Sequence, residues 1–315
     1  MQADASAKVI GPSLTAFATD PSQLSSSDQY DLATFLDLTD SLASVDPSSR
    51  FAGIAWHELE NCWRSCQSGT INAYPFPLFS PQDVASHVSA ARALMAQHST
   101  TGTLPIFITE SIPRDQFYLP GMAAGYIAVS EGSGIADANR TCFGCSSGFD
   151  GLFVSNPANP QDPNPAPTGI YWVYNAYAAM LGNRVSALAN AKDLIPLATW
   201  DGSSRVLKIL IGRAGDCGPS QQGMPDRCPT STGSSDAASQ AKVNIHLPIQ
   251  IASVTVTEQD FSIEEGSKSS SGPVVVFTQT MIPVGQDLTV PLNSLRNGQT
   301  AGIIDGDAYL ITVQM

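Results

Sequence analysis

The stretch that decides the fold is LPIFITE, which runs from Leu104 to Glu110. Its first six residues suit a buried strand, and the seventh is a carboxylate. The chain then breaks at SIPRDQFYLPG, where two prolines interrupt it. A nearly continuous apolar run is typical of a parallel strand covered on both faces. We therefore expect a buried parallel strand that presents Glu110 at its carboxyl end.

The same order of strand and helix recurs four times in the first half of the chain. We expect strands at residues 7–14, 51–59 and 104–110, with the fourth in either 136–143 or 149–154. Apolar residues at helical spacing predict the helices, at residues 26–42, 80–99, 120–134 and 168–182. Gly11-Pro12 is expected to stop the first strand, and Asp28 with its preceding serines to cap the first helix. Right-handed crossovers then bring the carboxyl ends of all strands to one rim.

The second half of the chain has a different pattern. Short apolar runs separated by Gly, Ser, Pro and Asn predict an all-β domain, most simply an antiparallel sandwich. The strands are expected at residues 204–212, 242–249, 252–261, 273–281, 286–292 and 307–315. The sequence thus predicts an α/β domain over residues 1–182 and a β-sandwich over residues 183–315.

The composition excludes several classes of partner. Lys and Arg total 15 against 28 Asp and Glu, for a net charge of −13, and such a surface repels nucleic acid. No apolar run approaches the ~20 residues needed to cross a bilayer. No signal peptide is visible at the first residue. Scarce Lys, plentiful Ser, Gly and Pro, and the sequon at Asn139 nevertheless favour an extracellular or secretory protein.

Six cysteines fall in three close pairs, as expected in an oxidising compartment: Cys62/Cys66, Cys142/Cys145 and Cys217/Cys228. The last pair closes a loop rich in Gly and Pro and is the best candidate disulfide. A zinc site formed by the first four cysteines is an alternative, although their spacing is unlike that of a zinc finger or ribbon. The four histidines are scattered, and the two at positions 87 and 98 are expected on a surface helix. We therefore expect no metal.

Candidate chemistry gathers at two strand ends. WHE, residues 56–58, ends the second strand as Thr-Glu ends the third, so Glu58, His57 and Glu110 are expected at one rim. Paired carboxylates are the requirement of a retaining glycosidase. The structural alternative is a solvated Glu110 and a core His57. GCSSG, residues 144–148, offers Ser146 as an esterase nucleophile, but the helix that this motif requires does not follow.

Six motifs, taken in order, resemble the last four strand–helix units of a clan A glycoside hydrolase, above all the family 39 type and its uncharacterised relatives. They are AKVIGPSL, IAWHEL, PIFITE, ANRTCF, FDGLF and YWVYNAYAAMLGNRV. The tail from LATWDGSSRVLKILIGR to DGDAYLITV resembles the β-sandwich that follows the barrel. The resemblance implies strands five to eight of a (β/α)8 TIM barrel within residues 1–182, followed by a C-terminal antiparallel β-sandwich.

The resemblance also assigns roles to single residues. It makes Glu110 the nucleophile, His57 the residue that orients it, and Phe143 an aromatic wall for the sugar. Trp56 and Glu58 border the site, Trp56 as a candidate sugar contact and Glu58 as a weaker candidate for the second carboxylate. The substrate class is an oligosaccharide, polysaccharide or glycoside, and no cofactor or metal is implied.

One departure from the family pattern concerns the acid/base. The family takes this carboxylic acid from an Asn-Glu pair that ends the fourth barrel strand, and no Asn-Glu dipeptide precedes Glu110. We therefore expect a fragment of a retaining O-glycosidase that lacks the acid/base half of the barrel. A half-barrel leaves two sheet edges open, which predicts a missing barrel half or self-association. The alternative function is a non-catalytic carbohydrate-binding or assembly protein.

Overall fold

The computed structural model describes residues 8–14, 17–20, 22, 31–46, 51–59, 78, 80–112, 116, 119–140, 152–154, 165–215, 241–262, 272–296 and 299–315. The chain forms two compact units. The first comprises Met1–Asp115, Val129–Phe143 and Cys217–Asp226, and the second Gln116–Ala128, Gly144–Asp216 and Arg227–Met315. Within the described ranges, no helix combines the length and the hydropathy needed to span a membrane.

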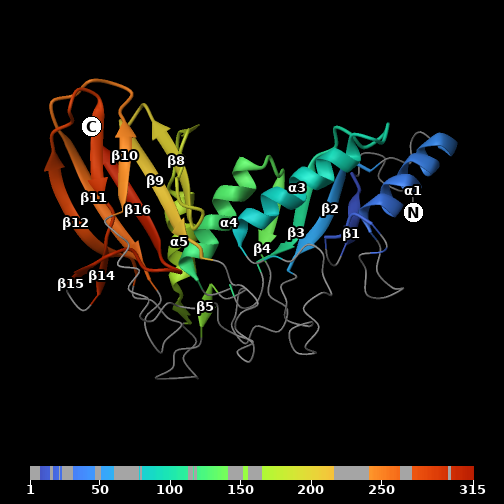
Figure 1. Ribbon diagram of the computed structural model, residues 1–315, viewed down its shortest axis with the longest axis horizontal. Coiled ribbons are helices and arrows are strands. Elements are labelled where there is room, and N and C mark those ends of the chain that lie inside the picture. The colour runs from blue at the N-terminus through green and yellow to red at the C-terminus, as the bar shows by residue number, and fades with distance from the viewer. Residues whose placement is uncertain are drawn as a thin grey trace. The chain divides into compact units, whose positions relative to one another are not determined.

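The first unit contains a four-stranded parallel sheet in the order β1-β2-β3-β4 (Figure 1). The strands are β1 (Ile10–Leu14), β2 (Gly53–Glu58), β3 (Ile106–Ser111) and β4 (Asp137–Arg140). The parallel sheet predicted from the sequence is thereby confirmed, and its fourth strand is the first of the two alternatives. The prediction that Gly11-Pro12 stops the first strand is wrong, because β1 continues to Leu14.

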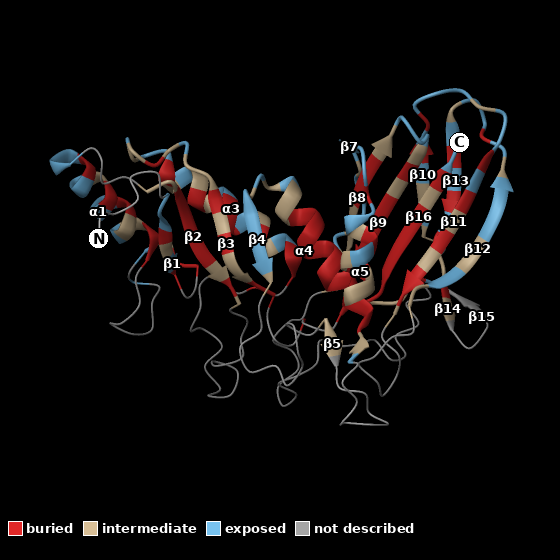
Figure 2. Ribbon diagram, turned by 180° about the vertical axis from the view of Figure 1, so that it is seen from behind, coloured by how far each residue is buried: buried red, intermediate tan, exposed pale blue. Residues whose placement is uncertain are grey.

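Two helices of the first unit begin at residues that satisfy their free N–H groups. The helix α1 (Leu32–Val45) is capped by Asp31, which accepts a hydrogen bond from the Thr34 N–H at 2.9 Å. The expected cap near Asp28 is therefore displaced to Asp31. The helix α3 (Pro81–Met95) has Pro at its start, as predicted, and lies on one face of the sheet in both views (Figures 1 and 2).

The sheet and its helices bury an apolar core. The residues at most 1% exposed include Ile54, Trp56, Ile106 and Ile108 of the strands and Leu36 of α1. In β2 nearly every residue is buried, whereas β3 alternates buried and partly exposed residues. The burial pattern is visible along β2 and β3 in Figure 2.

The second unit contains a six-stranded antiparallel sheet in the order β12-β11-β16-β9-β8-β7 and a two-stranded sheet, β10-β13. The six strands are β7 (Asn183–Val185), β8 (Leu194–Asp201), β9 (Val206–Arg213), β11 (Val254–Phe261), β12 (Val274–Met281) and β16 (Ala308–Gln314). β10 (Lys242–His246) and β13 (Asp287–Pro291) share a core cluster with the larger sheet. All six antiparallel strands predicted for this half are present, whereas β8 was not predicted.

Shorter elements complete the described structure. The helices α4 (Pro120–Gly132) and α5 (Gly169–Ala178) occupy two of the predicted helical segments. β5 (Phe153–Val154) pairs with β6 (Ala166–Pro167), so the second alternative for the fourth parallel strand belongs to a separate small sheet. β14 (Ser294–Arg296) pairs with β15 (Gln299–Ala301).

Candidate active site

The parallel register of β2 and β3 brings His57 and Glu110 together at the carboxyl ends of the strands. The two residues are register partners, and Nδ1 of His57 lies 3.4 Å from Oε2 of Glu110. Their side chains are 16% and 18% exposed, so both are partly shielded while remaining accessible from the rim. Among the residues predicted for the site, these two are brought together at the accessible rim.

The environment of His57 favours its neutral form. Burial lowers the pKa of the imidazole below its ordinary value of 6.5, and the negative charge of Glu110 opposes this effect only in part. A neutral imidazole has one protonated and one unprotonated ring nitrogen. His57 therefore serves as both a donor and an acceptor near neutral pH.

Two hydroxyl groups extend this site, and sequence reasoning missed both. Oγ of Ser13 lies 3.0 Å from Nε2 of His57 and 2.9 Å from Oγ1 of Thr109. Ser13 follows Gly11-Pro12, which was interpreted as the end of the strand. The available signal was positional, because Ser13 and Thr109 stand at the ends of strands that flank β2.

Trp56 and Glu58 point to the other face of the sheet, as expected for residues on either side of His57 in an alternating strand. Trp56 is fully buried and Glu58 is 2% exposed. The Trp56 indole N–H donates to Oε1 of Glu58 at 2.5 Å. Nδ1 of His87 lies 2.8 Å from Oε2 of the same carboxylate. Both Glu58 oxygens are thus engaged inside the protein.

His87 itself corrects one expectation. The residue was expected on a surface helix, but it is 3% exposed and stacks on Phe17 with ring centroids 4.7 Å apart. Phe17 also contacts Trp56, at 5.2 Å between ring centroids. Trp56, Glu58, His87 and Phe17 therefore form one buried cluster between the sheet and α3.

Several predicted features lie outside the described residues. These are Phe143, Ser146 and all six cysteines. Among the described residues, no group of three or more His, Cys, Asp or Glu side chains is arranged to hold a metal ion.

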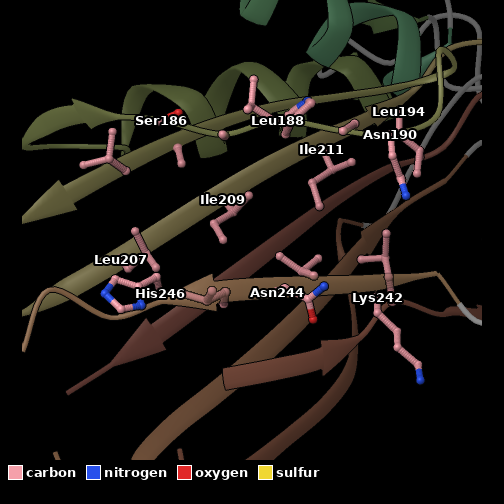
Figure 3. A pocket seen from close by; sticks show the side chains of 18 of the residues that line it. Ser186, Leu188, Asn190, Leu194, Leu207, Ile209, Ile211, Lys242, Asn244 and His246 are labelled. Carbon is pink, nitrogen blue, oxygen red and sulfur yellow. The ribbon is translucent and has the colours of Figure 1, made fainter. Parts of the chain in front are cut away.

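A separate cavity of about 720 Å³ lies in the second unit. Leu207, Ile209 and Ile211 of β9 line one side, opposite the β10 strand that carries Asn244 and His246 (Figure 3). Trp200 also lines it, and none of the described lining residues is acidic. The cavity is of a size that binds small molecules, but it offers no pair of carboxylates for glycoside hydrolysis.

The fold of this chain is similar to parts of several solved structures. The chain is similar to N2152 from Neocallimastix frontalis, with a TM-score of 0.65 and 19% sequence identity over 99% of this chain and 61% of that one. It is also similar to a glucosidase from Croceicoccus marinus, with a TM-score of 0.60 and 14% identity over 98% and 60% of the respective chains. A xyloglucanase of glycoside hydrolase family 44 from Paenibacillus polymyxa matches with a TM-score of 0.56 and 12% identity, over 99% and 58%.

At these identities the similarity concerns the fold. The chain shares its fold with parts of glycoside hydrolases and spans about three fifths of the length of the structures that it matches. No family model matches the sequence, and no curated protein matches it either.

Proposed function

We propose that this chain is the C-terminal part of a retaining O-glycoside hydrolase in which Glu110 is the nucleophile. The observation that carries the proposal is the pair of His57 and Glu110 at adjoining strand ends, 3.4 Å apart and both accessible from the rim. Carboxylates at the carboxyl ends of parallel strands stand where such sheets place their active sites. The fold shared with parts of glycoside hydrolases supports the same assignment.

In the proposed reaction, a carboxylate oxygen of Glu110 attacks the anomeric carbon and forms a covalent glycosyl ester. The bond to the leaving-group oxygen breaks, and that oxygen keeps the electron pair and takes a proton from a carboxylic acid. Water then attacks the same anomeric carbon and gives its proton to the carboxylate that this acid became, while the bond to Glu110 breaks and Glu110 is released as a carboxylate. His57 donates an N–H toward Glu110 and orients it. The buried bonds of Glu58 to Trp56 and His87 suit a structural role better than the acid/base role.

The acid/base is therefore proposed to lie on a segment not contained in these residues. We propose that β1 to β4 are strands five to eight of a (β/α)8 barrel, and that the antiparallel unit is the accessory sandwich of the family 39 type. Among the described strands, β1 and β4 are the two edges of the parallel sheet. A missing barrel half, or self-association, would cover these edges. A glycoside substrate, secretion and a Cys217–Cys228 disulfide belong to the same proposal.

The test of the nucleophile uses activated 2-deoxy-2-fluoro glycosides that carry a fluoride or dinitrophenolate leaving group. Such groups leave as anions, so the first step proceeds without the missing acid. We expect mass spectrometry to find one fluoroglycosyl group on Glu110 and none in the Glu110→Gln variant. Asp137→Asn is the matched control, because Asp137 is an exposed carboxylate at the amino end of the neighbouring strand β4. Labelling that survives Glu110→Gln would refute the assignment.

The test of the missing half is the source transcript, read upstream of Met1. Four further strand–helix units and an Asn-Glu pair would complete the proposed enzyme. A transcript whose open reading frame starts at Met1 would leave the half-barrel without its acid and favour a binding function.

The second candidate function is carbohydrate binding without turnover, which the cavity of the second unit favours. Trp200, Asn244 and His246 supply an aromatic face and polar groups to that cavity. If this function is correct, calorimetric binding of an oligosaccharide should be unchanged by Glu110→Gln and weakened by Asn244→Ala. Binding that depends on Glu110 would instead favour the rim.

A further inference from the structure

Two of the β-bulges at the rim flank β2, one in its pairing with β1 and one in its pairing with β3. In the pairing of β1 with β2, Pro12 lies opposite Ala55 and Leu14 lies opposite Trp56, so Ser13 is the extra residue without a partner. In the pairing of β2 with β3, Ile108 lies opposite Trp56 and Glu110 lies opposite His57, so Thr109 is the extra residue. Bulges re-aim side chains and are frequent beside active sites. Here they bring two hydroxyl groups to within 2.9 Å of each other across the central strand.

The backbone at the first bulge is unusual for a serine. Ser13 has a φ of 61°, which lies in the left-handed region and costs on the order of 1–3 kcal/mol for a residue other than glycine. The side chain of Ser13 is exposed, so burial of this side chain does not offset the strain energy of its backbone. The contact between Oγ of Ser13 and Nε2 of His57, at 3.0 Å, is the interaction that the strained conformation makes possible.

The donor and acceptor roles follow from the chemistry of the groups. An ionised Glu110 carboxylate accepts hydrogen bonds but donates none, so its neighbour Nδ1 of His57 must carry a proton. Nε2 of a neutral imidazole then carries none and must accept. The hydroxyl of Ser13 is the donor within reach of Nε2 among the described residues. Thr109 can in turn donate to Oγ of Ser13, or to the Trp56 carbonyl oxygen at 3.3 Å.

We propose that Ser13 is a positioning residue whose hydroxyl donates to Nε2 of His57 and thereby fixes the tautomer that directs an Nδ1–H toward Glu110. This inference rests on the proposed function only in calling Glu110 the nucleophile. In the fixed tautomer, the N–H stabilises the ionised carboxylate and holds it in one orientation. Without Ser13, the imidazole can turn an unprotonated Nδ1 toward Glu110, where two acceptors repel each other.

The test measures the tautomer directly by ¹⁵N NMR of the histidine side chains, with His57 assigned from its loss in a His57→Gln variant. In the native chain at pH 7.5 we expect the Nδ1–H tautomer. Ser13→Gly removes the hydroxyl, and glycine adopts a positive φ without strain, so the bulge is preserved. We expect this variant to weaken the Nδ1–H preference, which Glu110 alone then supports, and to show a higher pKa for His57, because the neutral form loses its hydrogen bond to Ser13.

Two controls separate this effect from a change in folding. Ser186→Gly alters an exposed serine of the second unit and should leave the His57 signals unchanged. Thr109→Val removes the second hydroxyl while leaving Ser13 in place, and should shift the tautomer in the same direction to a smaller extent. An Nε2–H tautomer in the native chain, or an unchanged tautomer in Ser13→Gly, would overturn the proposal.

The same variant links the inference to catalysis. The net worth of one hydrogen bond predicts that Ser13→Gly slows fluoroglycosyl labelling of Glu110 by about twofold to tenfold. The NMR measurement needs no substrate, so the two proposals fail separately. A native Nδ1–H tautomer that depends on Ser13, with no labelling of Glu110, would refute the glycosidase and retain the positioning role.

Discussion

Replacing Glu258 by glutamine should stabilise the second unit at alkaline pH. Glu258 lies on β11, is fully buried, and its Oε1 accepts a hydrogen bond from the Asn293 N–H at 2.7 Å. Its Oε2 is buried without a hydrogen-bond partner among the described residues. Burial, together with the negative charge of Asp260, raises the pKa of Glu258 from 4.5 to about 7. Glutamine keeps a side-chain oxygen that can accept the hydrogen bond from the Asn293 N–H, but it has no carboxyl group that titrates.

The magnitude follows from the two pKa values. The difference between 4.5 and about 7 corresponds, at 1.36 kcal/mol per pKa unit, to roughly 3 kcal/mol. Because the pKa is raised in the folded state, the stabilising contribution is fully present below pH 4.5. It is lost as the pH rises through about 7. The native chain should therefore lose roughly 3 kcal/mol relative to Glu258→Gln between pH 4.5 and pH 8.

Urea denaturation of both proteins, repeated across this pH range, measures the difference. Groups that titrate in both proteins cancel in the comparison, so the pH-dependent part reports Glu258 alone. A ¹³C NMR titration of the Glu258 carboxyl supplies the same pKa independently. A difference in unfolding free energy that stays constant within about 1 kcal/mol from pH 4.5 to pH 8 would refute the reasoning.

Three further changes test the ion pair, a close backbone contact and a helix cap. Glu110→Gln removes the charge that raises the pKa of His57, so NMR titration should find that pKa lower still, and a higher value would contradict the ion pair. Gly121→Ala places a Cβ against two backbone carbonyls and should cost about 1–3 kcal/mol in urea denaturation. Gly132→Ala, in the same helix with open space, should cost nothing. Asp31→Ala removes the α1 cap and should lower the free energy of unfolding by about 1 kcal/mol in urea denaturation. An unchanged free energy would contradict a stabilising role of this cap.

The parallel sheet was predictable because its strand β2 is buried at nearly every position and β3 is buried at alternate positions. Burial demands apolar residues, and β2 supplies them at consecutive positions from Gly53 to Trp56, whereas in β3 the buried Ile106 and Ile108 alternate with partly exposed residues. The same physics made Glu110 conspicuous, since a charge at the end of such a run must lie at the rim. Its pairing with His57 then followed from the parallel register.

The strand β8 was missed because proline argues against a paired strand. Pro196 pairs in register with Ile211 of β9, whereas β7 pairs only with residues 198–200 of β8. At Pro196, then, the other side of β8 has no strand among the described residues, and such edge positions are where strands tolerate proline. Pro196 therefore lies in the part of β8 that pairs only with β9 among the described strands.

The hydroxyl groups of the site were missed for a different reason. Ser13 and Thr109 owe their positions to bulges, and a bulge is set by the register between two strands. Neither strand contains that information by itself. The burial of His87 was likewise hidden, because its partner Glu58 is 29 residues away in the sequence.

The bulges also have a consequence for engineering this rim. A residue that has no partner in the ladder can change without shifting the pairs on either side, which here are Pro12 with Ala55 and Leu14 with Trp56. Position 109 is therefore a site at which the donors, acceptors and size of the rim can be varied, whereas the positive φ at position 13 favours Gly, Asn and Asp there. A small combinatorial library, restricted at position 13 to residues that tolerate a positive φ, would sample new chemistry beside Glu110.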